Sequence, residues 1–237
     1  MKYLLMLMLS WVPLAALDYT EYGRLLGTYA KETGVDYAGW FANKADIEAL
    51  DAFLRMSAEV DVAAMSAADQ KAFYINLYNA AMLQVVFQHY PLNSVTEIGE
   101  KPFDVFKDTF IRQGDRLLSL DDVEKGILLK EFFDPRIHFA VNCASESCPP
   151  LRVEPFTGEQ LEAQLDEQTR LFAKSDRAAR ESDHANKIVY SSLFDWYNKD
   201  FEGDNPAEYL NRYREDPLPL DYEIGWIKYD WALNLIN

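Results

Sequence analysis

The chain has 237 residues, and its 39 Asp and Glu against 23 Lys and Arg give a formal net charge of −16. So acidic a surface repels phosphates, which argues against nucleic acid and anionic membrane surfaces as partners. The 14 Tyr, 14 Phe and 5 Trp residues can fill a sizeable core, and the length allows one large domain or two small ones.

The first residues have the pattern of a secretory signal peptide. Lys2 is followed by an uncharged, mostly apolar stretch from Tyr3 to Ala16, too short for a bilayer, which needs about 20 apolar residues. The alternative is an ordinary buried N-terminal helix. We predict a signal peptide over residues 1–16 and a single globular domain over residues 17–237, exported to the periplasm or secreted. The mature chain contains no segment that resembles a membrane span.

Two amphipathic helices are predicted next, over residues 18–33 and 45–56, from apolar side chains at helical spacing. A third helix is predicted over residues 66–89, because Ser66 and Asp69 form a helix-start pattern and Pro91 stops it. This third helix has almost no polar side chains between residues 72 and 87, so we expect it to be buried at the centre of the fold.

Asn76 and Asn79 are the notable polar residues of that central helix. They are three residues apart and therefore lie on one side of it. A buried amide must find hydrogen-bond partners or it costs a few kcal/mol. Two explanations stand: the amides satisfy backbone groups of nearby loops, or they line a functional cleft.

The middle of the chain predicts a hairpin, a helix and a strand. Gly114-Asp115 is an accepted two-residue turn between β-like runs over residues 109–113 and 116–120. Ser119 is placed to cap a helix over residues 121–132, and the run Ile137–Val141 has strand composition.

The last third mixes further helices with short strands, and it lacks the alternation of strand and helix that a parallel sheet requires. Helices are predicted over residues 159–173 and 193–201 and after Asn205-Pro206, and strands over 187–191 and 222–231. The whole chain therefore predicts an α+β fold, rich in helix, with a small and mostly antiparallel sheet.

Residues 134–152 concentrate the reactive side chains, including both cysteines and His138. One hypothesis is a disulfide between Cys143 and Cys148, which an oxidising compartment would permit. A second is nucleophilic catalysis by Cys143 with His138 as base. On a strand the two side chains would point to opposite faces, so they meet only if the strand ends near Asn142; His138 would more naturally share a cleft with Asn142.

Metal and cofactor chemistry find little support in the sequence. His138, Cys143 and Cys148 could supply three ligands, but their spacing matches no standard zinc pattern. The chain has no P-loop, dinucleotide-binding fingerprint or serine-hydrolase elbow. We therefore predict no metal and no cofactor.

Several stretches resemble a known family. Residues 71–80 (KAFYINLYNA) and 134–152 (DPRIHFAVNCASESCPPLR) are similar to the two signatures of the domain of unknown function 547 family. Residues 118–127, 156–161 and 192–201 are also similar, and the resemblance extends over residues 35–215. The resemblance implies motif positions at Asn76, Tyr78, Asn79, His138, Asn142, Cys143, Ser147 and Pro149.

The resemblance implies an exported bacterial protein but no established activity. A helix with polar motif residues, followed by a strand with a histidine, is also the layout of papain-like and transglutaminase-like enzymes. This is an analogy of fold only, and those enzymes place the nucleophilic cysteine at the start of the helix. We predict a cleft between helix 66–89 and strand 137–141. Its candidate catalytic residues are His138, Cys143, Asn76 and Asn79, and its candidate binding residues are Tyr78, Asn142, Ser147 and Arg152.

Two functions are compatible with these residues. The first is a thiol-dependent hydrolase or acyl-transfer enzyme that acts on a small molecule or peptide. The second is a non-enzymatic periplasmic binding or scaffolding module with a Cys143–Cys148 disulfide.

Overall fold

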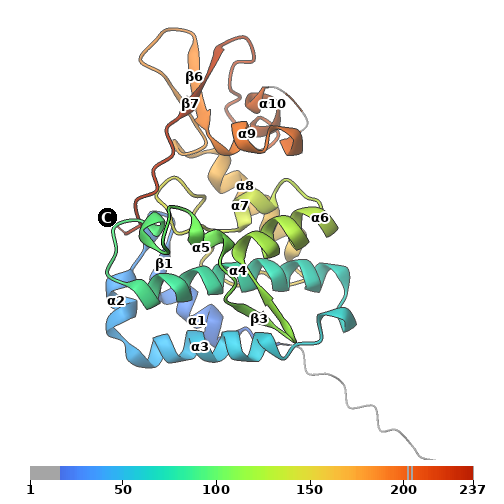
Figure 1. Ribbon diagram of the computed structural model, residues 1–237. Helices are drawn as coiled ribbons and strands as arrows, with labels where there is room; N and C mark the ends of the chain where they lie inside the picture. The colour runs from blue at the N-terminus through green and yellow to red at the C-terminus, as the bar shows by residue number, and fades with distance from the viewer. Residues whose placement is uncertain (1–16, 202, 204, 237) are drawn as a thin grey trace, which may run out of the picture.

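The computed structural model describes residues 17–201, 203 and 205–236 (Figure 1). The predicted signal peptide, residues 1–16, lies outside them. The described chain is a helix-rich α+β protein with small sheets, as predicted. Its lower part is a helical body, and its upper part is a smaller unit that holds the three-stranded sheet (Figure 1).

The N-terminal helices form one side of the body. They are α1 (Thr20–Tyr29), α2 (Tyr37–Ala42) and α3 (Lys44–Ala58), with the two-residue strands β1 (Ala30–Lys31) and β2 (Gly34–Val35) between α1 and α2. The predicted helices over 18–33 and 45–56 correspond to α1 and α3. Asn43 caps α3, because its side chain accepts the Asp46 backbone N–H.

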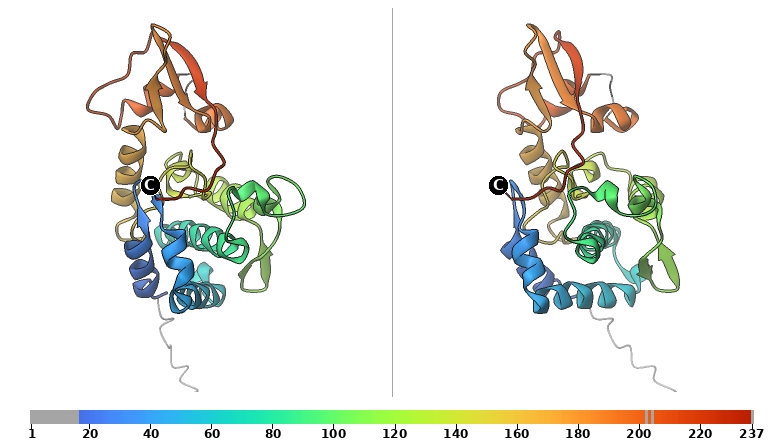
Figure 2. Two further views of the ribbon diagram at one scale, coloured as in Figure 1. Left: turned by 90° about the vertical axis from the view of Figure 1, so that its left-hand side faces the viewer. Right: turned by 60° about the vertical axis from the view of Figure 1, so that its left-hand side comes forward.

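The central helix α4 runs from Ala67 to His89 and is preceded by the 3₁₀ turn η1 (Val62–Ala64). Ser66 caps it by accepting the Asp69 backbone N–H at 3.2 Å. Nearly every residue from Ala72 to Phe87 is buried, which confirms the prediction of a buried helix. Figure 2 shows α4 enclosed by the elements around it.

A series of short elements covers α4. It comprises the 3₁₀ turn η2 (Val95–Glu97), helix α5 (Asp104–Lys107), the hairpin β3 (Ile111–Gln113) with β4 (Arg116–Leu118), the π-helix η3 (Asp122–Leu128), and the helices α6 (Leu129–Glu131) and α7 (Ile137–Ala140). The hairpin turns at Gly114 as predicted, with Gln113 opposite Arg116. At the start of η3, the Ser119 backbone N–H donates to Asp122 Oδ2 at 2.9 Å and the Asp122 backbone N–H donates to Ser119 Oγ at 3.0 Å, the reciprocal pattern of a capping box.

The predicted strand over 137–141 is wrong: Ile137–Ala140 is a helical turn, α7. Asp134 starts this turn, because its side chain accepts the Arg136 backbone N–H at 3.0 Å and its carbonyl accepts the Ile137 N–H at 3.0 Å. The predicted alternation of faces between His138 and Cys143 therefore does not apply.

Helix α8 (Leu161–Ala173) leads from the body to the upper unit, which contains β5 (Ala179–Glu181), β6 (Lys187–Ser191), α9 (Leu193–Trp196), the 3₁₀ turn η4 (Asn198–Phe201), α10 (Pro206–Leu210) and β7 (Glu223–Ile227). The strand order is β5-β6-β7, with β5 antiparallel and β7 parallel to β6. Asn205 caps α10 and Pro206 occupies its first turn, as predicted.

The two parts have separate cores. The body packs around α4, whereas a second, aromatic cluster lies under the upper sheet and includes Phe172, Phe194, Phe201 and Tyr209. Phe139 belongs to α7 of the body but packs in this second cluster, with its ring 5.0 Å from that of Phe172. No helix within the described ranges has the length and apolarity to cross a bilayer.

After β7 the chain returns to the body as an extended tail (Figure 2). Leu233 bridges to Ser145, and Leu235 bridges to Val35 of β2. The Glu146 N–H donates to the Ala232 carbonyl at 2.7 Å, and the Asn234 N–H donates to the Ala144 carbonyl at 3.1 Å. The tail thereby holds the loop that carries both cysteines.

Candidate functional site

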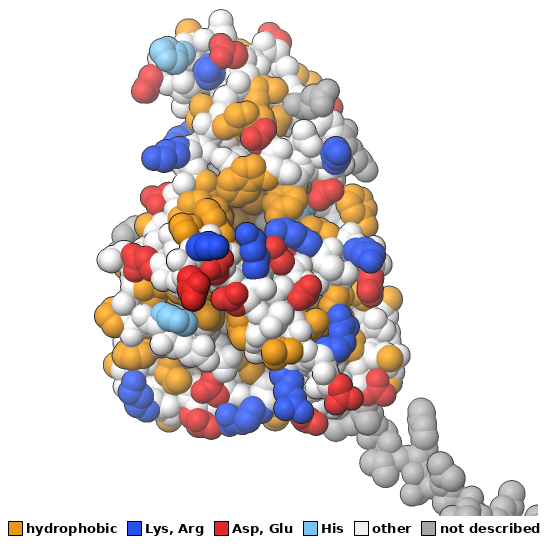
Figure 3. Space-filling view, in the orientation of Figure 1, with side chains coloured by type: hydrophobic (Ala, Val, Ile, Leu, Met, Phe, Trp, Pro, Cys, Tyr) orange, Lys and Arg blue, Asp and Glu red, His pale blue; other side chains and the backbone are white. Residues whose placement is uncertain are grey.

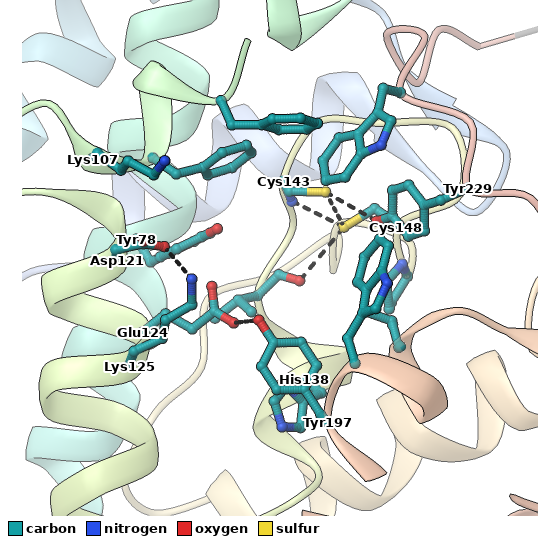
Figure 4. A pocket seen from close by; sticks show the side chains of 17 residues that line it. Tyr78, Lys107, Asp121, Glu124, Lys125, His138, Cys143, Cys148, Tyr197 and Tyr229 are labelled. Carbon is teal, nitrogen blue, oxygen red and sulfur yellow. Dashed lines mark hydrogen bonds and ion pairs between the residues drawn. The ribbon is translucent and has the colours of Figure 1, made fainter. Parts of the chain in front are cut away.

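A cavity of about 310 Å³ lies between the helical body and the upper unit. Figure 3 shows the hollow, with apolar side chains around it and basic side chains along its lower edge. The body provides the thiols and most of the charged groups, and the upper unit and tail provide aromatic rings (Figure 4). The lining residues are Tyr78, Phe103, Phe106, Lys107, Asp121, Glu124, Lys125, His138, Val141, Cys143, Cys148, Pro149, Leu193, Trp196, Tyr197, Tyr229 and Trp231.

The two cysteines face each other at one end of this cavity. Their Sγ atoms lie 2.9 Å apart, and both thiols are free. The Cys143 backbone N–H donates to Cys148 Sγ at 3.0 Å. Ala144 has φ of 59°, and its N–H donates to the Asn142 side chain at 2.9 Å. This local turn folds the loop so that the cysteines, five residues apart, meet.

Polar groups surround the Cys143 thiol. The Ser145 hydroxyl lies 2.9 Å and the Tyr229 hydroxyl 3.2 Å from Cys143 Sγ. Burial raises the pKa of this thiol, but hydrogen bonds with Cys148, Ser145 and Tyr229 outweigh burial and lower the pKa to about 7. Burial, together with Cys143, raises the pKa of the Cys148 thiol well above its ordinary value.

Glu124 places a buried carboxyl in the same cavity. It belongs to the π-helix η3, and helices of this type occur frequently at functional sites. Burial raises its pKa, against smaller opposing effects of His138, Lys125 and Tyr197. Tyr197 donates a hydrogen bond to Glu124 Oε1 at 3.1 Å. This carboxyl therefore holds its proton to higher pH than an exposed glutamate does.

His138 lies deeper, beneath Tyr197 (Figure 4). The centroids of their rings are 4.1 Å apart. Its Nε2 is 2.8 Å from Asp200 Oδ2, and its side chain is almost fully buried. Among the described residues no hydrogen bond joins His138 to Cys143; Asp200 takes the position that a thiol would need at Nε2.

The two asparagines of α4 lie outside the lining of the cavity. Asn76 donates to the Phe156 carbonyl at 2.7 Å and accepts the Phe156 N–H at 2.9 Å. Asn79 donates to the Ala140 carbonyl at 3.0 Å and accepts the Asn142 N–H at 2.8 Å. Both amides therefore satisfy backbone groups of loops, the first of the two explanations drawn from the sequence.

The four candidate binding residues are dispersed. Tyr78 lines the cavity, and burial raises its pKa well above the ordinary value. Asn142 is buried beside the cavity and donates to the Pro149 carbonyl at 2.8 Å. Ser147 accepts the Asp230 N–H at 2.9 Å, which attaches the cysteine loop to the tail. Arg152 lies elsewhere and pairs with Glu154 and Glu167 at 2.5 and 2.7 Å.

Sequence reasoning missed several lining residues. Glu124 and Tyr197 lie within the stretches 118–127 and 192–201 that carry the resemblance, so that signal could have found them. The aromatic residues Tyr229 and Trp231 were assigned only to a predicted strand. Within the described ranges, no group of three or more His, Cys, Asp and Glu is arranged to hold a metal ion.

Fold and site together define a helix-rich α+β protein with a pair of free thiols in an aromatic cavity. Residues 62–173 match the model of the family described as "Protein of unknown function, DUF547", the family that the sequence resembles. No curated protein and no solved structure matches the chain.

Proposed function

We propose that the cavity is the active site of a thiol-dependent hydrolase or acyl transferase in which Cys143 is the nucleophile. The observation that supports this most is the environment of Cys143, which lines the cavity and has the Ser145 and Tyr229 hydroxyls within 2.9 and 3.2 Å of its sulfur. These contacts favour the thiolate, the form of cysteine that attacks carbon.

In this proposal Glu124 is the acid and base. The Cys143 thiolate attacks the acyl carbon of the substrate, the bond to the leaving group breaks, and the leaving group takes the proton of Glu124. A thioester on Cys143 results. Water or an acceptor nucleophile then gives a proton to Glu124 and attacks the thioester, which releases the thiolate. In this proposal His138 does not contact the thiol. Its ring packs against that of Tyr197, and its charge opposes the rise that burial causes in the pKa of Glu124.

An acylation experiment tests the nucleophile. Incubation with p-nitrophenyl acetate should give a burst of nitrophenol and one acetyl group on the peptide that contains Cys143, as determined by mass spectrometry. Cys143→Ser should lose both signals, because a serine hydroxyl lacks the low pKa of the thiol, while Cys148→Ser serves as the matched control and keeps them. An equal burst in Cys143→Ser would refute the proposal.

The pH dependence of alkylation tests the thiolate. With its pKa at about 7, Cys143 should react with iodoacetamide at a rate that rises through pH 7 and levels off above it. An ordinary thiol, with a pKa of about 8.5, would still be gaining rate there. Tyr229→Phe removes one hydrogen-bonding hydroxyl and should move the midpoint to higher pH. A midpoint above pH 8 in the wild-type protein would contradict a nucleophilic role.

A second candidate function is a non-enzymatic binding or scaffolding module, as the sequence analysis also considered. The roles of Asn76 and Asn79 favour it, because both side chains of the family motif stabilise loop backbone. In that case a Cys143–Cys148 disulfide would close the loop, and neither acylation nor rapid alkylation would be seen.

We further propose that the protein works after export, in the periplasm or outside the cell, on a small molecule or peptide. The pattern of residues 1–16 supports the export. N-terminal sequencing of the protein recovered from fractionated cells tests it. A cytosolic protein that still begins at Met1 would refute it.

A further inference from the structure

The second thiol does not attack the substrate in the proposed acyl transfer, yet it lies at the same end of the cavity as Cys143. Cys148 Sγ is 2.9 Å from Cys143 Sγ, and both residues line the cavity. The two differ in access, because Cys148 is only 4% exposed whereas Cys143 is half-buried. One reachable thiol in contact with one protected thiol is the arrangement that disulfide exchange requires.

We propose that Cys143 and Cys148 form a thiol–disulfide exchange site, in which Cys143 attacks the substrate disulfide and Cys148 resolves the product. Only Cys143 forms a covalent bond with the substrate in the proposed acyl transfer, whereas this activity requires both thiols.

The loop is already shaped for the oxidised state. A disulfide bond joins two sulfur atoms at about 2.05 Å, so the sulfurs must approach by less than an ångström from their present 2.9 Å. The turn at Ala144 and the hydrogen bond from the Cys148 N–H to the Ser145 carbonyl, at 3.0 Å, hold the loop in the folded shape that this approach needs.

The exchange is balanced over two steps. The Cys143 thiolate attacks one sulfur of a substrate RSSR, the S–S bond breaks, and one RS⁻ leaves. The product is a mixed disulfide on Cys143. Cys148 then loses its proton to the released thiolate and attacks Cys143 Sγ, which expels the second RS⁻. This second RS⁻ takes from water the proton that Cys143 released when it ionised. The protein loses two electrons, the substrate gains them, and two molecules of RSH form; a dithiol substrate runs the sequence in reverse.

The lining of the cavity indicates which disulfides fit. Trp196, Tyr229 and Trp231 form a continuous aromatic wall, with ring centroids 4.5 Å apart for Tyr229 and Trp231 and 4.9 Å apart for Trp196 and Tyr229. Phe103 extends it, 4.8 Å from Trp231. Lys107 also lines the cavity and has no ion pair among the described residues. A small disulfide with flat apolar substituents and a carboxylate suits this lining.

Dithiobis(nitrobenzoate), an aromatic disulfide that carries carboxylates, is a suitable probe. With excess protein, each probe molecule should release two thionitrobenzoate ions, and the protein should lose two thiols without keeping an adduct. Cys148→Ser should release one ion per probe and retain the other half as a mixed disulfide on Cys143. Cys143→Ser should react at least tenfold more slowly, because the protected Cys148 would have to attack.

Thermal unfolding of both variants should show that they remain folded. Trp196→Ala, which removes part of the aromatic wall and leaves both thiols, should slow the first release in the wild-type background without changing the ratio of two ions per probe. A stable mixed disulfide in the wild-type protein, or equal rates for the two serine variants, would overturn the proposal. Either result would leave the acylation test of Cys143 untouched.

Discussion

The helical body and the upper unit contribute different things to the cavity. The body supplies Cys143, Cys148 and Glu124, and all three lie within residues 62–173, the segment that matches the family. The upper unit and the tail supply Trp196, Tyr197, Tyr229 and Trp231 from outside that segment. The reactive groups thus come from the family segment, whereas most of the aromatic wall comes from a later stretch of the chain. The two are coupled at Tyr229, whose ring belongs to the wall and whose hydroxyl lies 3.2 Å from Cys143 Sγ.

The two regions are also stabilised in different ways. The body is organised around one long buried helix, α4, whose polar side chains hold loops in place. The upper unit has short elements around an aromatic cluster. One connection to the body is a ring that the body itself provides: Phe139 of α7 is 1% exposed and packs in this cluster.

The largest effect should come from removing that connection. Phe139→Ala should cost about 3–5 kcal/mol of unfolding free energy, because truncating a fully buried Phe loses its burial and leaves a void. Hydrogen exchange should rise more in β5, β6 and α10 than in α4. Denaturant unfolding of Phe133→Ala, whose side chain is 58% exposed, is the control and should change by less than about 0.5 kcal/mol. Uniform loss of protection would contradict the division into two cores.

A smaller effect is expected within the body. Asn76→Ala should cost roughly 2–4 kcal/mol, because it leaves the buried N–H and C=O of Phe156 without partners, in the lower part of the range of about 1–3 kcal/mol for each group. The midpoint of Cys143 alkylation should stay where it is, since Asn76 does not line the cavity. Asn93→Ala, an exposed asparagine, provides the comparison for denaturant unfolding. A shift of this midpoint would contradict the purely structural role of Asn76 and support its predicted catalytic role.

The smallest effect concerns the carboxyl that Tyr197 of the upper unit contacts. The pKa of Glu124 is raised in the folded protein, so the folded state binds this proton more tightly than the unfolded state. The stabilisation from this group is therefore present below the unfolded pKa of about 4.3 and declines as pH rises through the folded pKa. Glu124→Gln removes the titration and should gain stability over the wild-type protein as pH rises from 4 to 7. A constant difference in Tm across that range would contradict the raised pKa.

Elements with strong local signals could be predicted from the sequence. The helix over 66–89 has a cap at Ser66 and lacks a polar face, and the hairpin has a turn at Gly114. The strand over 137–141 could not be predicted correctly, because the β-like composition of Ile137–Val141 competes with a helical start at Asp134 that fixes only one turn. A segment of four residues is too short for periodicity to decide.

The cavity depends on contacts that are remote in sequence. His138, Cys143 and Cys148 of the segment 134–152 do line one cavity, but the sequence did not indicate the partner of Cys143. Tyr229 is 86 residues from Cys143, and Asp200 is 62 residues from His138. No local pattern encodes such pairings. The prediction that each asparagine needs partners was physically sound, and the structure shows that backbone groups supply them.

The pairing of the tail with the cysteine loop has a consequence for biosynthesis. Chains emerge from the ribosome starting at the N-terminus and can begin to fold before they are complete. The thiol loop needs Tyr229, Ala232 and Leu233 to reach its final surroundings. Both cysteines are thus synthesised about 80 residues before the segment that encloses them, and until it arrives they are open to oxidants and to other thiols. Whether the two cysteines are thiols or a disulfide when the tail covers them therefore depends on whether oxidation precedes or follows the docking of the tail.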